Sequence, residues 1–168
     1  INGFSLEWFG STISLSDDGS IVASSSSSGS DIGRSGVRIY QNRNSEWIQI
    51  GSDIDKEDLS YRDAWVVSLS ADGSLAAIAS SWNNNNIFVG IKVRIFKYIN
   101  GLWTQVGSDI DRDIGDGTWS SAKANVSLSS DGSTIAIGAT PNSGGFNDYF
   151  DREGETVKVY KNINTNWE

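Results

Sequence analysis

Hydrophobic and polar positions alternate in three short segments of this chain. Each segment carries Ile or Val, then Leu two residues later, and runs into Asp-Gly followed by Ser, at residues 13–20, 67–74 and 126–133. A period of two is typical of a β-strand with one buried face. Asp-Gly between two β-rich runs favours a hairpin closed by a type I′ turn. The pattern therefore predicts repeated β-hairpins.

A second block confirms that the chain is repetitive. Residues 37–40 read Val-Arg-Ile-Tyr, and close variants stand at 93–96 and 157–160. A Trp follows each block, and the intervals between these Trp residues are 56 and 64 residues. Each period offers four β-rich segments, and helical periodicity is not sustained anywhere. The sequence predicts an all-β fold of four-stranded antiparallel sheets.

A four-stranded sheet recurring at this length is typical of β-propeller blades. About three blades are expected, at residues 4–53, 65–109 and 124–168, the last with an incomplete final strand. Ala23, Ala77 and Ala136 coincide in the repeat, and such small residues would let neighbouring blades approach. The repeated Trp47, Trp103 and Trp167 are expected in the core between blades. A closed propeller has about four to eight blades, so other blades or copies of the same protein are expected to complete an assembly.

Composition narrows the range of partners. The 168 residues include 13 Lys and Arg against 21 Asp and Glu, for a net charge of -8. Such a surface disfavours nucleic acid and anionic membranes, and favours cations or neutral, sugar-like ligands. Cysteine and histidine are absent, which excludes disulfides, thiolate metal sites and the usual general base. The apolar runs are too short to span a bilayer, so no direct membrane insertion is predicted.

Nearly all variation in loop length falls at one end of the predicted blades. The Asp-Gly turns and the connections after 37–40 and its counterparts are constant, whereas the variable segments are 26–36, 52–64, 81–92, 108–123 and 140–156. Variable loops on a constant scaffold commonly carry binding sites. Aromatic residues outside the repeat pattern are the predicted ligand contacts: Trp82, Phe88, Trp119, Phe146, Tyr149 and Phe150.

An acidic segment is the strongest candidate for a cofactor site. Carboxylates at alternate positions in a Gly-containing loop can converge on one Ca²⁺, which prefers six to eight oxygen ligands. The predicted ligands are Asp109, Asp111, Asp113 and Asp116, and a less complete set stands at the same place in the first repeat as Asp53, Asp55 and Glu57. The alternative is a solvated acidic turn, because Asp is a common turn residue. The Asp-Gly aspartates Asp18, Asp72 and Asp131 are read as turn residues.

Three motifs together resemble a known repeat. They are Trp-x-Gln-x-Gly-Ser-Asp-Ile from Trp47 and again from Trp103, the Ser-Leu-Ser-x-Asp-Gly-Ser hairpin, and the Val-Arg-Ile-Tyr block. The set resembles repeats of secreted and cell-surface β-propeller proteins and is similar in layout to FG-GAP repeats, whose Phe-Gly pair appears once, at Phe9-Gly10. The resemblance covers essentially the whole chain. It implies an extracellular or cell-surface location and no single activity, because such folds host many functions.

No catalytic motif stands out. The chain has no nucleophile elbow, no phosphate-binding Gly-rich loop before a helix, and nothing to single out a catalytic carboxylate pair among its acids. We therefore expect a non-catalytic structural or interaction module, of a surface or filament protein, that binds partner chains or glycans through variable loops. A calcium-dependent carbohydrate-binding propeller is the alternative, and a glycoside-active enzyme is the weaker one. Asn125 heads a glycosylation sequon in a predicted strand, where we expect little occupancy.

Overall fold

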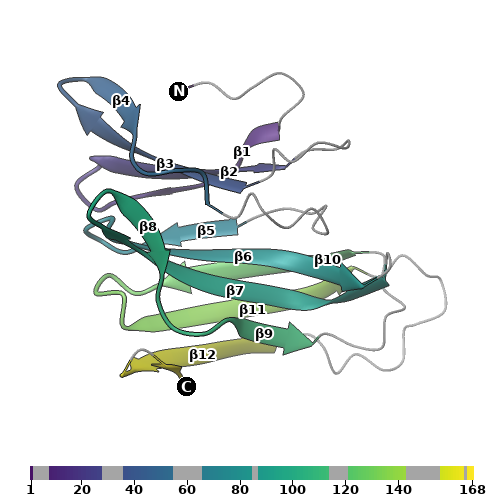
Figure 1. The fold of residues 1–168 in the computed structure, drawn as a ribbon. Helices are drawn as coiled ribbons and strands as arrows, with labels where there is room; N and C mark the ends of the chain where they lie inside the picture. Colours follow the sequence, from purple (N-terminus) through teal and green to yellow (C-terminus); the bar gives the residue numbers. More distant parts are fainter. Residues whose placement is uncertain are drawn as a thin grey trace.

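The fold is entirely β in the part of the chain that the structure describes. The computed structural model describes residues 1, 8–27, 36–54, 66–84, 87–113, 121–142, 156–164 and 166–168. Within these ranges there are three antiparallel sheets of four or five strands and no helix. The sheets follow one another along the chain and lie in three layers, from the purple first sheet to the green and yellow third (Figure 1). The predicted fold class, all-β with repeated antiparallel sheets, is confirmed.

Each sheet has its strands in chain order. The first contains β1 (Trp8–Leu15), β2 (Ile21–Ser27), β3 (Gly36–Arg43) and β4 (Glu46–Gln49). The second contains β5 (Val66–Leu69), β6 (Leu75–Asn84), β7 (Ile87–Ile99) and β8 (Leu102–Gln105), and β9 (Ile110–Asp113) pairs with β7 beside them. The third contains β10 (Ser121–Leu128), β11 (Thr134–Asn142), β12 (Thr156–Ile163) and β13 (Asn166–Trp167).

The fourth, outermost strand of the repeat is interrupted, and a second segment continues the pairing after the interruption. Along β7, residues 96–99 pair with β8 and residues 90–93 pair with β9. In the first sheet β4 pairs with β3, and Ile54 bridges to Val37 further along the same strand. The breaks contain Gly51 and Gly107, whose φ angles are 75° and 78°. A fifth strand in the second sheet therefore arises from interruption of the fourth.

Two segments expected as loops contain strands in their described parts. In the tract 81–92, β6 continues to Asn84 and β7 begins at Ile87, with a bulge between Trp82 and Asn83. In the tract 108–123, Ile110–Asp113 forms β9 and β10 begins at Ser121. The loop assignment was wrong because variable length was taken as lack of structure. These ladders continue the repeated sheet instead.

The Asp-Gly hairpin turns differ from the predicted type. In the first, Gly19 N–H donates to Ser16 C=O at 2.9 Å, so the turn spans Ser16 to Gly19. Within the three described Asp-Gly turns only the glycine has a positive φ, between 66° and 70°, whereas type I′ requires two such residues. The prediction was wrong because five residues, Ser16 to Ser20, separate β1 from β2 rather than two, and Ile21 N–H donates to the Ser16 hydroxyl at 2.9 Å.

The turns with two positive φ angles lie in the other hairpins. Asn44 and Ser45, between β3 and β4, have φ of 53° and 69°. Asn100 and Gly101, between β7 and β8, have φ of 51° and 87°. Two-residue loops of this kind match the right-handed twist of the paired strands. Both hairpin types lie at the same end of the sheets (Figure 1).

The middle sheet is buried on both faces. Alternate residues of β6 enter different cores: Ala76 and Ile78 pack toward the first sheet, and Ala77 and Ala79 pack toward the third. All four are at most 1% exposed. Small side chains on this strand let the flanking sheets approach closely, as the repeat of Ala predicts for Ala23 and Ala77, which are fully buried.

Corresponding repeat positions build both cores. One face of the first sheet contributes Ala23, Val37, Ile39, Ile50 and Ile54, and the same positions of the second sheet contribute Ala77, Val93, Ile95, Val106 and Ile110. The opposing face contributes Val67, Leu69, Ala76, Ile78, Phe96 and Trp103 in one core, and Val126, Leu128, Ile135, Ile137, Tyr160 and Trp167 in the other. One interface is therefore used twice, in the same direction along the chain.

The repeated Trp residues occupy equivalent register positions but not equivalent environments. Trp103 packs against the first core and donates its indole N–H to Ile50 C=O at 2.9 Å. Trp167 packs against the second core. Trp47, predicted to be core, is 36% exposed, because it lies on the face of the first sheet that no other described sheet covers.

The glycine of the first Trp-x-Gln-x-Gly motif, Gly51, makes room for the indole of Trp103. A Cβ at Gly51 would lie 2.6 Å from Trp103 Cδ1, and its φ is +75°. Gly101 also has a left-handed φ of +87°, but a Cβ there would meet nothing within 4 Å.

We expect Gly51→Ala to lower the free energy of unfolding more than Gly101→Ala does. Both variants incur the left-handed cost of roughly 1–2 kcal/mol, and overpacking against the indole adds about 1–3 kcal/mol at Gly51 only. Urea unfolding followed by Trp fluorescence measures both. Equal losses in the two variants would show that the Trp103 contact does not constrain position 51.

Candidate functional site

The predicted calcium ligand Asp53 lies in a polar cluster beside the first sheet. Its Oδ2 accepts from Arg38 Nε at 3.1 Å, and its Oδ1 accepts from Gln49 Nε2 at 2.8 Å. Arg38 comes from β3 and its side chain is 6% exposed, against 29% for Asp53. The guanidinium also lies over the ring of Phe9, 5.3 Å from its centroid. A buried cation thus already neutralises this carboxylate.

Asp109 has the equivalent arrangement in the second repeat. Gln105 Nε2 donates to its Oδ1 at 2.7 Å, and Lys92 Nζ lies 3.0 Å from its Oδ2. Partial burial, the largest single influence, raises the pKa of Asp109. The hydrogen bonds from Lys92 and Gln105 and the charges of Lys92 and Arg94 outweigh it, so the net pKa lies below 3.8.

Asp111 is the third predicted ligand whose side chain is described. It lies on β9 opposite Lys92 in the ladder, and its Oδ1 is 3.8 Å from Lys92 Nζ. One ammonium group therefore faces both Asp109 and Asp111. Asp113 also belongs to β9, whereas Asp116, Asp55 and Glu57 lie outside the described residues.

No group of three or more metal-binding side chains occurs among the residues that the structure describes. Calcium binding by the acidic segment stays a prediction, since the rest of that segment lies beyond these ranges. The Gln-x-Gly-Ser-Asp motif has a structural account instead. Its Gln side chain donates a hydrogen bond to its Asp side chain across the break in the outer strand. The same Asp pairs with a cation from the third strand of the sheet.

The Asp-Gly aspartates are turn residues, as predicted. Asp18 Oδ1 accepts from Ser16 Oγ at 2.7 Å and from Ser20 N–H at 2.9 Å, and Oδ2 accepts from Ser20 Oγ at 2.8 Å. The hydrogen bond from the Ser20 backbone is the largest cause of its lowered pKa. Asp72 and Asp131 make the corresponding contacts with the Ser residues on either side. This explains the recurrence of Ser two residues before and after the Asp.

The predicted ligand contacts fall into two groups. Trp82 and Phe88 belong to β6 and β7, where Asn83 pairs with Phe88 and Trp82 pairs with Gly90. Their backbones therefore share the far end of one hairpin. Trp119, Phe146, Tyr149 and Phe150 lie outside the described part of the chain.

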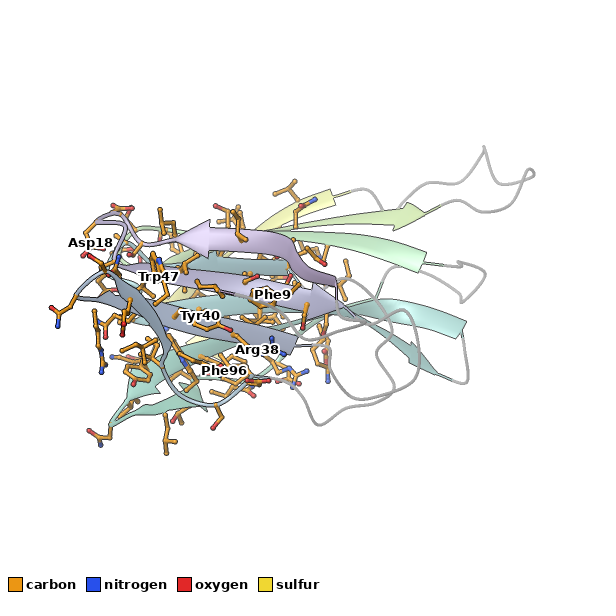
Figure 2. The ribbon with its side chains drawn as sticks, turned by 90° about the horizontal axis from the view of Figure 1, so that it is seen from above. Phe9, Asp18, Arg38, Tyr40, Trp47 and Phe96 are labelled. Carbon is orange, nitrogen blue, oxygen red and sulfur yellow. The ribbon has the colours of Figure 1, made fainter. Side chains whose placement is uncertain are left out.

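An aromatic cluster on the first sheet was not anticipated. Phe9 and Tyr40 meet edge to face, with centroids 6.3 Å apart, and Arg38 lies over Phe9. Figure 2 looks onto this face, with Phe9, Arg38, Tyr40 and Trp47 labelled. The only signal in the sequence is the Phe9-Gly10 pair: Gly10 has a φ of 88°, and a bulge between Phe9 and Ile13 shifts the register of β1.

Comparison with known proteins adds little beyond this geometry. No family model and no curated protein sequence matches the chain. The crystal structure of TolB from Acinetobacter baumannii is 14% identical, with a TM-score of 0.45, over 92% of this chain and 33% of that one. A structure from a mechanistic analysis of two prolyl endopeptidases is 13% identical, with a TM-score of 0.39, over 98% of this chain and 27% of that one. The chain thus spans a third or less of either protein.

Two surface features complete the description. Asn125 is exposed on β10 and pairs with Gly138, which in turn pairs with Val157. The sequon asparagine therefore lies on the uncovered face of the third sheet. The described ranges hold no helix with the length and apolar character needed to cross a membrane.

Protonation of the turn aspartates is expected to weaken the fold in acid. Hydrogen bonds from Ser133 N–H, Ser129 Oγ and Ser133 Oγ lower the pKa of Asp131 from 3.8 to about 2. Its contribution to stability is present above 3.8 and is lost as the pH falls toward about 2.

We expect Asp131→Asn to flatten the dependence of the urea midpoint on pH in that window. Ser133→Ala keeps the carboxylate but removes one donor, so the folded-state pKa of Asp131 should lie closer to 3.8, and the loss of stability should be smaller and complete at a higher pH than in the unmodified protein. Superimposable pH profiles for the unmodified protein and Asp131→Asn would contradict this account of the turn.

Proposed function

We propose that the chain is a non-catalytic structural and interaction module of β-propeller type, belonging to an extracellular or cell-surface assembly. The observation that carries this proposal is the use of one sheet-to-sheet interface twice, by the same repeat positions and in the same direction. Stacking of this kind is how repeat architectures bury each unit against the next. Its direction leaves a different face at each end for a further unit.

Binding is assigned to the end of the sheets opposite the tight hairpin turns. The strand ends that lead into 28–35, 55–65, 114–120 and 143–155 lie there, since the strands alternate in direction. A net charge of -8 favours a partner chain or a neutral glycan over nucleic acid. Among the described residues, Trp82 and Phe88 lie at this end, in the β6–β7 hairpin, and are the proposed contacts with a ligand.

Glycan binding is tested by screening the whole chain on a glycan array and measuring hits by calorimetry. We expect Trp82→Ala and Phe88→Ala to weaken binding about tenfold or more, because stacking on a sugar ring is lost. Leu102→Ala is the control, since it removes an exposed apolar side chain from β8, at the opposite end of the sheet. Loss of binding in the control alone would refute the assignment to this end.

The calcium-dependent alternative makes a separate prediction. Calcium held by the acidic segment would raise the Tm of the chain at millimolar concentration, the range typical of extracellular modules, and EDTA would reverse the rise. Asp116→Asn should abolish the shift while Asp131→Asn keeps it, because Asp131 is engaged in a turn. Absence of any shift in the unmodified protein would remove this alternative.

A further inference from the structure

Among the described strands, two sheet faces have no other sheet packed on them, one at each end of the stack. The first sheet exposes Ile13 and Leu15 on β1, at 71% and 57%. The third sheet exposes Val157 and Val159 on β12, at 72% and 61%. These are neighbouring residues on sheet faces rather than scattered side chains at turns, and contiguous apolar surface of this kind marks an interaction site.

The first of these faces has a buried counterpart in the next sheet. Ile13 and Leu15 correspond to Val67 and Leu69, which are 5% and 7% exposed against the first sheet. We call the surface of Ile13, Leu15, Val22 and Trp47 the leading face; Tyr40 lies on the same side of the sheet but is only 9% exposed and already contacts Phe9. It differs from the equivalent face of the second sheet in lacking a preceding layer.

The other uncovered surface matches the opposite side of the same interface. Val157 and Val159 correspond to Val93 and Ile95, both fully buried against the third sheet. We call the surface of Ser127, Ala136, Val157 and Val159 the trailing face. The two end faces are thus the two halves of an interface that the chain already makes twice.

Contacts at the Asp-Gly turns follow the same pattern. A Cβ at Gly73 would meet Ile21 Cδ1 of the preceding sheet at 2.7 Å, and one at Gly132 would meet the side chain of Leu75. A Cβ at Gly19 would meet nothing within 4 Å. The leading face therefore has, at its turn as well as on its strands, the space that a preceding sheet fills elsewhere.

Hydrogen bonds between sheets give the two faces complementary chemistry. Leu69 N–H donates to Ser14 Oγ at 2.9 Å, and Leu128 N–H donates to Ser68 Oγ at 3.0 Å. The same positions place the Leu15 N–H on the leading face and the Ser127 hydroxyl on the trailing face. A donor at one end corresponds to an acceptor at the other.

A second set of hydrogen bonds between sheets has its donor on the earlier sheet and its acceptor on the later one. Asp17 N–H donates to Ala71 C=O, and Ala71 N–H donates to Ser130 C=O, both at 2.9 Å. The equivalent groups at the ends are the Ser130 N–H on the trailing face and the Asp17 C=O on the leading face. Each end therefore offers one donor and one acceptor in complementary positions.

We propose that the trailing face of one copy packs on the leading face of a second copy, and that two copies close head to tail into a ring of six sheets. This rests on the proposed propeller-type function. Six sheets fall within the roughly four to eight of closed propellers, whereas three copies would give nine. The closing contacts are Leu15 N–H to the partner's Ser127 hydroxyl, and the partner's Ser130 N–H to Asp17 C=O.

The alternative pairing of like faces is disfavoured by the same groups. Leading face on leading face would set two Leu15 N–H donors near each other, and a buried donor without an acceptor costs about 1–3 kcal/mol. Covering the leading face does not bury an unpaired charge, because Arg38 is already 5% exposed and bonded to Asp53.

Sedimentation velocity and light scattering on the whole chain test this pairing. The protein should be made without N-glycosylation, because Asn125 lies on the trailing face. We expect a species of twice the 18.2 kDa chain mass whose mass does not grow further with concentration. Leu15→Glu and Val159→Glu should each weaken association at least about tenfold, since a charge enters an apolar contact.

Mixing the variants identifies which faces meet. Leu15→Glu keeps its trailing face and Val159→Glu keeps its leading face, so an equimolar mixture should form a one-to-one complex that neither variant forms alone. Leu102→Glu is the control: Leu102 is 60% exposed, close to the 57% of Leu15, but lies on β8 of the middle sheet. It should remain a dimer, and circular dichroism should show all three variants folded.

Several outcomes would overturn the proposal. A monomer at every concentration, a mass that rises continuously, or pairing lost in Leu15→Glu but kept in Val159→Glu would exclude a closed head-to-tail pair. A monomeric chain that still binds a glycan through Trp82 and Phe88 would remove the pairing and leave the proposed function standing.

Discussion

Burial of both faces of the middle sheet is the constraint on which the rest of the structure depends. A period of two in a strand ordinarily separates a wet face from a dry one. In β6 the side chains on both faces are buried, since Ala76 and Ile78 enter one core while Ala77 and Ala79 enter the other. The middle sheet therefore depends on both neighbours for its own burial, and stability is shared between adjacent units rather than held within each.

The serines of the first strand of each repeat satisfy a geometric need created by this stacking. Facing sheets lie about 10 Å apart, too far for regular backbone pairing. The N–H groups of Leu69 and Leu128 are nevertheless directed at the preceding sheet, and a buried N–H needs an acceptor. Ser14 and Ser68 supply it with their hydroxyls. Polar residues in these strands are thus part of the packing and not a sign of a solvent-exposed face.

Much of the fold follows from the sequence, because the same strand and turn motifs occur in three copies. Alternation at 67–69 and the Val-Arg-Ile-Phe block at 93–96 give the strands, and their equal spacing gives equivalent sheets. Turn type did not follow, because Asp-Gly was read as a two-residue loop although Ser16 and Ser20 bond to Asp18 and make it a longer one. The two consecutive positive φ angles of a two-residue loop occur instead at Asn100 and Gly101.

The candidate sites were less predictable than the fold. Asp53 and Asp109 were counted as calcium ligands, yet each faces a cation from the neighbouring strand of the sheet, Arg38 or Lys92. Such pairs are invisible to spacing along the chain, since the partners are 15 and 17 residues apart and meet only across a break in the outer strand. Trp47 shows the same limit: its register was predictable, but its exposure depends on whether another sheet lies ahead of it.

The direction of the sheet interface has a consequence for how such a chain changes length. Both junctions between described sheets use the same apolar positions and the same serine-hydroxyl acceptors in the same order, so duplication or deletion of one whole repeat leaves this shared set of contacts intact. Loss of part of a repeat would instead set mismatched groups against each other. Genes encoding proteins of this construction can therefore vary in size by whole repeats with little disturbance to packing, while the loops between strands diverge independently.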